Sequence, residues 1–365
     1  MKKHLLFVGN RFINNPALQR YAIGSAKEKL GHLEQISYFQ DSDNSLFLIL
    51  DQLLKEKIKL LIITTKNSSA IVGKLLSTIT SDNQILKDNM LIPSQTSVFE
   101  EGSYLIEYEK AIVNVIIATE NKNLPSIILE DEKKSAKVHV FDESIPNVKI
   151  LLEPLATSFD IRLDLVAIVE GWVEVSVQSR KYGNIAQFIS AAKQLLSHKL
   201  IATNNIVGFI IEKLSHSNRK ITFAESCTGG LLAYTFTQES GASNVFEGSL
   251  VTYSNALKSN WLAVDDTILE KYGAVSLEVV NEMSEGALNV SYADYALAIS
   301  GIAGPNGGTT EKPVGTVCIS ARSKDSLKYE QIQLFGDRNY IQEQSAFYAI
   351  KMLLLLDKEL FFKDL

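Results

Sequence analysis

A short stretch that places a serine between an acidic residue and two glycines could carry nucleophilic chemistry. It reads ESCTGG at 225–230 and follows the apolar run ITFA at 221–224. Because residues 231–237 are typical of a helix, the pattern predicts a buried strand, a turn and a helix. The first N–H groups of a helix lack partners within the helix and lie at the positive end of its dipole. A hydroxyl at Ser226 would lie beside N–H groups that can hold an oxyanion, although Ser226 or Thr228 could equally be a helix N-cap.

Two further loops carry polar residues directly after predicted strands. The strand-like run at 248–252 is followed by YSNALK at 253–258, which ends in Lys258. A lysine together with the serine above is a possible hydrolytic dyad. The loop SGIAGPNGG at 300–308 follows a strand predicted at 295–299, and its glycines free backbone amides to bind anions. Loops after neighbouring parallel strands meet at one edge of a sheet, so the sequence predicts that the three loops share one site.

The elements that must position these loops alternate regularly towards the C-terminus. Besides the strand and helix around the serine, the sequence predicts strands near 246–252, 294–300, 313–321 and 327–335, and helices near 206–214, 265–272, 277–290 and 338–357. Such alternation is typical of a mixed sheet covered by helices. We therefore predict a three-layer α/β/α domain over residues 199–365.

Two other domains are predicted before this one. The first, at 1–135, is an α/β domain, and the second, at 136–198, is a small α+β module, with the charged run at 130–135 as a linker between them. The first rests on strands predicted at 4–8, 58–64, 111–118 and 126–129 and helices at 16–31 and 44–56. The second rests on strands predicted at 137–141, 160–168 and 171–177 and a helix at 185–198.

Composition excludes several classes of protein. The 365 residues are 46% hydrophobic and 21% charged, as in an ordinary soluble globular protein, and no apolar run is long enough to cross a membrane. A net charge of −6 disfavours direct binding of nucleic acid. The two cysteines, Cys227 and Cys318, lie far apart without neighbouring metal ligands, which favours a reduced cytoplasmic protein and no metal site.

Several motifs, in order, resemble the C-terminal domain of the CinA family, whose single-domain relatives are the PncC nicotinamide mononucleotide (NMN) amidohydrolases. The matching stretches are AESCTGG at 224–230, VTYSN at 251–255 with Lys258, GAVS at 273–276, SGIAGP at 300–305, KPVGTV at 312–317 and GDR at 336–338. The resemblance implies a serine amidohydrolase that converts NMN to nicotinic acid mononucleotide and ammonia in pyridine nucleotide recycling. It implies no cofactor and no metal.

The resemblance also implies a role for individual residues. Ser226 would be the nucleophile, Lys258 its base and Tyr253 a close supporter of both, with the backbone amides of residues 228–230 holding the oxyanion. The remaining contacts to substrate would come from Thr228, Gly229, Gly230, Ser300, Gly301, Gly304 and Arg338. The family often has a second arginine four residues after the Arg338 position, where this sequence has Gln342.

Other interpretations of these residues stay open at this point. Cys227 is a rival nucleophile, although no histidine lies near it in the motif to form a thiolate. Lys258 could be solvated, Tyr253 could belong to the core, and Arg338 could serve the start of the last helix. The chain could act on another small amide, or it could bind a nucleotide or a protein partner without catalysis.

The N-terminal half resembles the rest of a full-length CinA protein only in its order of domains. In the family, a molybdopterin-binding-like domain with ADP-ribose pyrophosphatase activity precedes a KH-like module. The family motif GTELL is replaced here by GNRFI at 9–13, and GGLGPT by TKNSSA at 65–70. The only acidic pair nearby is Asp41 and Asp43. We therefore predict a degenerate scaffold without catalytic residues, which helps the protein to form a homodimer.

Overall fold

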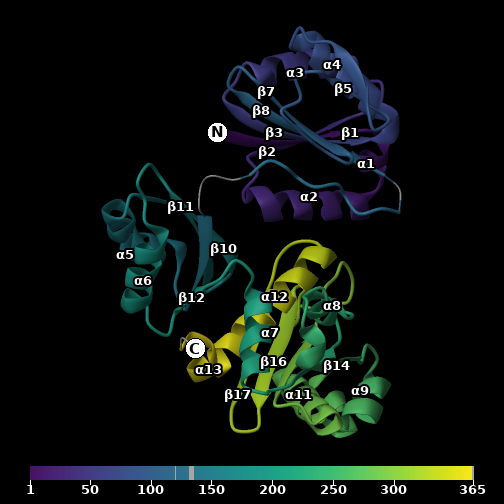
Figure 1. Cartoon of the computed structure of the whole chain (residues 1–365). Helices are drawn as coiled ribbons and strands as arrows, with labels where there is room; N and C mark the ends of the chain where they lie inside the picture. The colour runs from purple at the N-terminus through teal and green to yellow at the C-terminus, as the bar shows by residue number, and fades with distance from the viewer. Residues whose placement is uncertain (120, 131–134, 364–365) are drawn as a thin grey trace. The chain divides into compact units, whose positions relative to one another are not determined.

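A computed structural model describes residues 1–119, 121–130 and 135–363 (Figure 1). Within these residues the chain divides into two compact units, Met1–Lys133 and Lys134–Leu365. The mixed α/β class predicted from the sequence is confirmed. Residues 131–134, which form most of the predicted linker, lie outside the described residues, and the boundaries predicted after residues 135 and 198 stay predictions.

The first unit contains a mixed sheet with strand order β2-β1-β3-β8-β7-β6. The first four of these are parallel, namely β2 (Gln35–Phe39), β1 (Lys2–Val8), β3 (Ile58–Thr65) and β8 (Ala111–Ala118). Strand β7 (Ser103–Tyr108) pairs antiparallel with β8, and β6 (Val98–Glu100) pairs antiparallel with β7. The side chains of β1 point alternately into two apolar cores, one on each face of the sheet. Leu5 and Phe7 pack with α1 (Asn10–Asn14) and α2 (Pro16–Leu30), and Leu6 and Val8 pack with α3 (Leu46–Leu54) and α4 (Lys66–Ile79).

The strand predicted at 126–129 is not formed. Strand β8 is already paired on both edges, with β3 and with β7, so no ladder position remains beside it. The buried amide of Asn114 accepts instead from the N–H groups of Ile128 at 2.8 Å and Leu129 at 3.4 Å. The segment is therefore buried without being a strand. A hairpin of β4 (Gln84–Lys87) and β5 (Met90–Pro93), together with β2 and α4, was not predicted.

The second unit begins with a small antiparallel sheet of order β10-β11-β9-β12. Its strands are β9 (Ser135–Phe141), β10 (Ile161–Val169), β11 (Trp172–Ser179) and β12 (Leu200–Ala202). One apolar core joins this sheet to α5 (Ile145–Ser158) and α6 (Ile185–Leu195). Helix α5, which holds Pro154, was not predicted. Phe141 and Trp172 belong instead to the core of the sheet that follows.

The second sheet of this unit, of order β14-β13-β15-β16-β17, positions the candidate site. Strand β13 (Ile221–Glu225) lies between β14 (Phe246–Val251) and β15 (Tyr295–Gly301) and is parallel to both. Strand β16 (Thr316–Ser323) pairs antiparallel with β15, and β17 (Leu327–Gln333) pairs antiparallel with β16. These positions confirm the strands predicted near 246–252, 294–300, 313–321 and 327–335. The carboxyl ends of β13, β14 and β15 consequently meet at one edge of the sheet.

Helices pack on both faces of this sheet, as the alternation of side chains requires. On one face Phe223, Leu297 and Ile319 join the core of α7 (Ile206–His216), α8 (Leu231–Thr237), α12 (Arg338–Leu356) and α13 (Lys358–Phe362). On the other, Ala224 and Ala298 join α9 (Asn255–Leu262), α10 (Asp266–Tyr272) and α11 (Leu277–Ser291). The small alanines let α11 lie close to the sheet. Helix α9, which carries Lys258, was not predicted.

Candidate active site

Ser226 and Lys258 meet at the carboxyl edge of the sheet. The Lys258 Nζ lies 3.1 Å from the Ser226 Oγ, and only 8% and 1% of the serine and lysine surfaces are exposed. The register explains this, because Glu225 is paired with Val251, so the residues after β13 and β14 emerge side by side. Ser254 then caps α9 by accepting from the Leu257 N–H, and the first turn of that helix brings the lysine back over the serine.

Backbone carbonyls orient the lysine. Besides Ser226, the Nζ contacts the oxygen of Thr252 at 2.8 Å and that of Tyr253 at 3.4 Å. Burial lowers the pKa of Lys258 from 10.5 to about 8. A neutral amine has two N–H bonds and one lone pair. If the two carbonyls accept the two N–H bonds, the lone pair faces the serine hydroxyl, which is the arrangement of a general base and its nucleophile.

Cys227 is a poor alternative nucleophile. Only 4% of its surface is exposed, and burial raises the pKa of its thiol to about 12. A thiol reacts as a nucleophile through its thiolate, which such a pKa keeps at a very low population at neutral pH. Its sulfur also lies against the end of β15, because a Cβ added to Gly301 would lie 3.1 Å from the Cys227 Sγ. The thiol is therefore a packing group.

Glu225 supports the turn that carries Ser226, a contact that was not predicted from the sequence. Its fully buried carboxylate accepts from the N–H groups of Gly230, Leu232 and Ala233, each at 3.0 Å, and from the Ser249 hydroxyl at 2.9 Å. A carboxylate at the N-terminus of a helix satisfies its free N–H groups and its dipole. The acidic residue directly before a predicted helix start was the available signal. Glu225 thus holds the turn that carries Ser226.

In the turn at 226–230, fewer backbone N–H groups lack an acceptor than was predicted from the sequence. Of the amides at 228–230, that of Gly229 donates to the Ser226 carbonyl at 3.1 Å and that of Gly230 donates to Glu225. Within the described residues, the N–H groups of Cys227 and Thr228 have no such acceptor, and the buried Thr228 hydroxyl has no partner either. The amides of this turn that donate to no carbonyl or carboxylate of the described residues are thus those of Cys227 and Thr228, and the Cys227 N–H lies near the sulfur of its own side chain. Gly229 and Gly230 have φ of 60° and 100°, which favour glycine.

Arg338, Tyr253 and Gly304 form a second group at the same edge. Arg338 donates from Nη1 to the Gly304 carbonyl at 2.8 Å and from Nη2 to the Tyr253 hydroxyl at 3.0 Å. The Tyr253 side chain is 61% exposed, and it is the backbone oxygen of this residue that contacts Lys258. The loops after β14 and β15 and the start of α12 therefore converge. The structure thus brings together the loops that were predicted to share one site, and the roles of their residues stay predictions.

The side chains of Ser300 and Gln342 form hydrogen bonds with backbone carbonyls of neighbouring loops. Ser300 is 1% exposed, and its hydroxyl donates to the Ala274 carbonyl at 2.7 Å, which ties β15 to the loop before α11. Gln342, one turn beyond Arg338 on α12, donates from Nε2 to the Cys227 carbonyl at 2.6 Å. From the sequence alone, Gln342 is only a departure from a family pattern. Its spacing of four residues from Arg338 placed both on one helix face.

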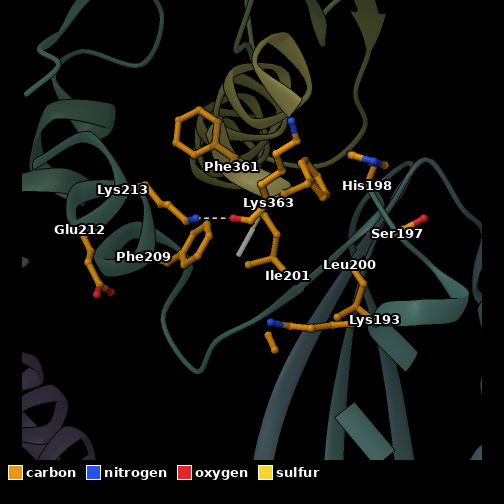
Figure 2. A pocket seen from close by; sticks show the side chains of 12 residues that line it. Lys193, Ser197, His198, Leu200, Ile201, Phe209, Glu212, Lys213, Phe361 and Lys363 are labelled. Atoms are coloured by element: carbon orange, nitrogen blue, oxygen red, sulfur yellow. Dashed lines mark hydrogen bonds between the residues drawn. The ribbon is translucent and has the colours of Figure 1, made fainter. Parts of the chain in front are cut away.

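A separate cavity lies elsewhere in the second unit, among β12, α6, α7 and α13. Its volume is about 510 Å³, and Figure 2 shows Lys213 pointing towards Lys363, whose carbonyl oxygen accepts from the lysine Nζ. The lining residues are Lys193, Ser197, His198, Leu200, Ile201, Ala202, Phe209, Glu212, Lys213, Phe361, Phe362 and Lys363. None of the predicted site residues is among them. The cavity is therefore distinct from the serine and lysine pair.

The described residues offer neither a metal site nor a membrane-spanning helix. In the part of the chain that the structure describes, no three His, Cys, Asp or Glu side chains gather in a way that could hold a metal ion. Over the same residues, no helix combines the length and the apolar character needed to span a membrane.

Comparison with known proteins finds relatives of the last part of the chain. A sequence model of the CinA C-terminal domain matches residues 203–356. The nicotinamide-nucleotide amidohydrolase PncC of Enterobacter agglomerans is 47% identical over 135 residues, which are 37% of this chain and 82% of that protein. A CinA-like protein of Fervidobacterium nodosum is 46% identical over 144 residues, which are 40% of this chain and 35% of that protein.

These matches differ in how much of the relative they cover. The chain thus spans about a third of the CinA-like protein of F. nodosum but most of PncC. Among solved structures, the competence/damage inducible protein CihA of Agrobacterium tumefaciens is 35% identical, with a TM-score of 0.41 over 42% of this chain and 96% of that one. Since the family model and a relative covered over 82% of its length agree, the chain belongs to the CinA family.

Proposed function

We propose that the chain hydrolyses the carboxamide of nicotinamide mononucleotide, giving nicotinic acid mononucleotide and ammonia. The observation that carries the proposal is the buried contact of 3.1 Å between the Lys258 Nζ and the Ser226 Oγ. The pKa of Lys258, lowered to about 8 by burial, lets a useful fraction of the amine be neutral near physiological pH. A relative 47% identical over this region is named as a nicotinamide-nucleotide amidohydrolase, which supports the substrate class.

The first half of the reaction forms an acyl-enzyme. Neutral Lys258 takes the proton of the Ser226 hydroxyl as the oxygen attacks the carboxamide carbon. The negative charge that develops on the carbonyl oxygen is stabilised by the N–H groups of Cys227 and Thr228. The Lys258 ammonium then gives its proton to the amide nitrogen, the C–N bond breaks, and ammonia leaves. An oxyanion donor of this kind is commonly worth about 3 kcal/mol of the barrier.

The second half repeats these steps with water. Lys258, neutral again, takes a proton from a water molecule that attacks the ester carbon, and the same two amides hold the new oxyanion. The proton then passes to the Ser226 oxygen as the ester bond breaks, which releases the carboxylic acid and restores the dyad. The carbonyls of Thr252 and Tyr253 keep the Lys258 nitrogen at the reacting centre in both its neutral and its protonated form.

The charges around the dyad support this substrate class. A carboxamide on a cationic pyridinium ring has an electron-poor carbonyl carbon, which favours attack by serine. Arg338 uses two of its N–H groups within the protein and keeps a delocalised positive charge suited to a phosphate. We assign the phosphate of the nucleotide to Arg338 and keep Gly301 and Gly304 as substrate contacts. The homodimer and the cytoplasmic location stay predictions, and sedimentation equilibrium would measure the first.

A panel of amides tests this proposal. The purified chain is incubated with NMN, nicotinamide riboside, nicotinamide and glutamine, and ammonia release is measured for each. We expect NMN to be turned over fastest, and nicotinamide riboside more slowly because it lacks the phosphate. Faster release from glutamine would assign the same site to another small amide, and no release from any of the four would favour a binding protein without catalysis.

A further inference from the structure

The side chain of Gln342 contacts the nucleophile turn from a distant part of the sequence. Its Nε2 donates to the carbonyl oxygen of Cys227 at 2.6 Å, and its position on α12 is set by the long buried face of that helix. The acceptor is a carbonyl oxygen, so the nitrogen end of the amide must face it. The contact is half-buried, and Cys227 is the residue directly after Ser226.

Peptide geometry gives this contact a consequence for the site. The peptide between Cys227 and Thr228 is trans, so its C=O and N–H bonds point in opposite directions within one plane. When Gln342 holds the C=O on one side, it fixes where the Thr228 N–H points on the other. Donation to the carbonyl also polarises the peptide and strengthens its N–H as a donor.

The turn needs such an external support. Gly229 and Gly230 follow directly, both with positive φ, and glycine restricts the backbone least of all residues. The Thr228 carbonyl accepts from the Leu231 N–H at 3.1 Å, which holds the far side of Thr228, and Glu225 holds the helix beyond it. The peptide plane that precedes Thr228 is the part that Gln342 fixes.

We infer that Gln342 is a positioning residue for the oxyanion, acting through the Cys227–Thr228 peptide on the Thr228 N–H. The inference rests on the proposed function, because it assumes that Ser226 forms a tetrahedral intermediate next to this N–H. Gln342 does not touch the reacting atoms. Its effect should therefore fall on the transition state and leave the binding of substrate unchanged.

The test compares three variants of the full chain with NMN as substrate. Gln342→Met keeps the length of the side chain without a donor, Gln342→Arg keeps a donor, and Gln344→Met is a matched control two residues along the same helix. We expect kcat of Gln342→Met to fall about ten- to a hundredfold with KM nearly unchanged, somewhat less than the loss of a direct oxyanion donor. The kcat of Gln342→Arg should be nearer to that of the wild type, and the kcat of the Gln344→Met control should equal that of the wild type.

Two binding measurements separate positioning from a merely structural role. The Kd of NMN, measured by calorimetry, should be the same for Ser226→Ala as for Ser226→Ala combined with Gln342→Met. A raised Kd or KM, an unchanged kcat, or an equal loss in Gln342→Arg would overturn the inference.

Acylation by p-nitrophenyl acetate keeps the inference separate from the proposed function. If the wild-type chain releases no ammonia from NMN, the proposed function fails, and the rate at which the ester acylates Ser226 replaces kcat as the readout. A slower burst in Gln342→Met, restored in Gln342→Arg, supports the inference on its own. A burst equal to wild type in Gln342→Met, or no burst that depends on Ser226, overturns it.

Discussion

The chemistry of the site depends on how deeply one lysine is buried. In water the amine of Lys258 would be protonated at neutral pH and could not take a proton from Ser226. Removal of its side chain from solvent, to 1% exposure, disfavours the ammonium and brings its pKa down to about 8. The same burial raises the pKa of the neighbouring thiol of Cys227 and so favours the hydroxyl over the thiol as nucleophile. Burial thus supports both the choice of Lys258 as the base and the choice of Ser226 over Cys227 as the nucleophile.

The pH dependence of the rate follows from this pKa. Because the proposed mechanism requires the neutral amine and the pKa is lowered from 10.5 to about 8, activity should rise with pH and level off above about pH 8. At pH 7 about one lysine in ten is neutral, so the rate should fall about tenfold for each unit below that. The measurement is kcat/KM for NMN from pH 6 to 10, with the product separated by chromatography.

A control variant tells whether the profile belongs to the lysine. Lys258→Ala should be nearly inactive, and its residual rate should lose the inflection near pH 8. A rate that falls as the pH rises from 6 to 9, or an inflection that persists in Lys258→Ala, would contradict the assignment of the base.

At the scale of elements, the strands and the serine turn were predictable, but helix α9 was not. Val, Ile and Leu runs bounded by glycine and polar loops predict buried strands, and the ESCTGG stretch marks a strand-to-helix junction. The sequence SNALKSNWL lacks a clear apolar stripe, so the helix that carries Lys258 depends on its cap and on packing. Contacts such as those of Glu225 and Gln342 depend on tertiary placement, which local patterns do not contain.

The close approach of α9 and α11 gives a prediction at this scale. A Cβ added to Gly286 would lie 2.0 Å from the backbone oxygen of Leu262, so an alanine there must push the two helices apart. Since α9 carries Lys258, Gly286→Ala should lower kcat and also destabilise the fold by about 1–3 kcal/mol. Urea unfolding and ammonia release from NMN measure the two effects.

Gly24 offers a matched control, because it is also helical but a Cβ there would meet nothing within 4 Å. Gly24→Ala should leave the rate unchanged and raise stability slightly, by up to about 1 kcal/mol. Wild-type rate and stability in Gly286→Ala would show that the helices can adjust without moving the lysine.

At the scale of the molecule, the first unit has four neighbouring parallel strands, and a carboxylate lies at the edge where such sheets bind ligands. At the carboxyl ends of its parallel strands, Asp41 accepts from the Ser68 and Thr65 hydroxyls and from the Asn10 N–H. Ligands of such sheets bind at this edge. A carboxylate of the chain itself occupies these donors and would repel the phosphates of a nucleotide.

We therefore expect no pyrophosphatase activity on ADP-ribose from the full chain, with or without Mg²⁺, Mn²⁺ or Co²⁺. Metal-assisted attack on a diphosphate needs carboxylates that hold the ion and donors that hold the phosphates. Chromatography of AMP released from ADP-ribose is the measurement, with Ser226→Ala as the control that separates it from the dyad. Metal-dependent release of AMP well above the metal-free blank would show that this unit is catalytic.

The most direct test of the central claim compares ammonia release from NMN by Ser226→Ala and Cys227→Ala. The two residues are neighbours on one turn, and both substitutions remove a single small group from a buried side chain. The account predicts that Ser226→Ala loses activity by at least about a thousandfold while its circular dichroism stays that of the wild type, and that Cys227→Ala keeps most of the rate. Full activity in Ser226→Ala, with loss in Cys227→Ala, would contradict it.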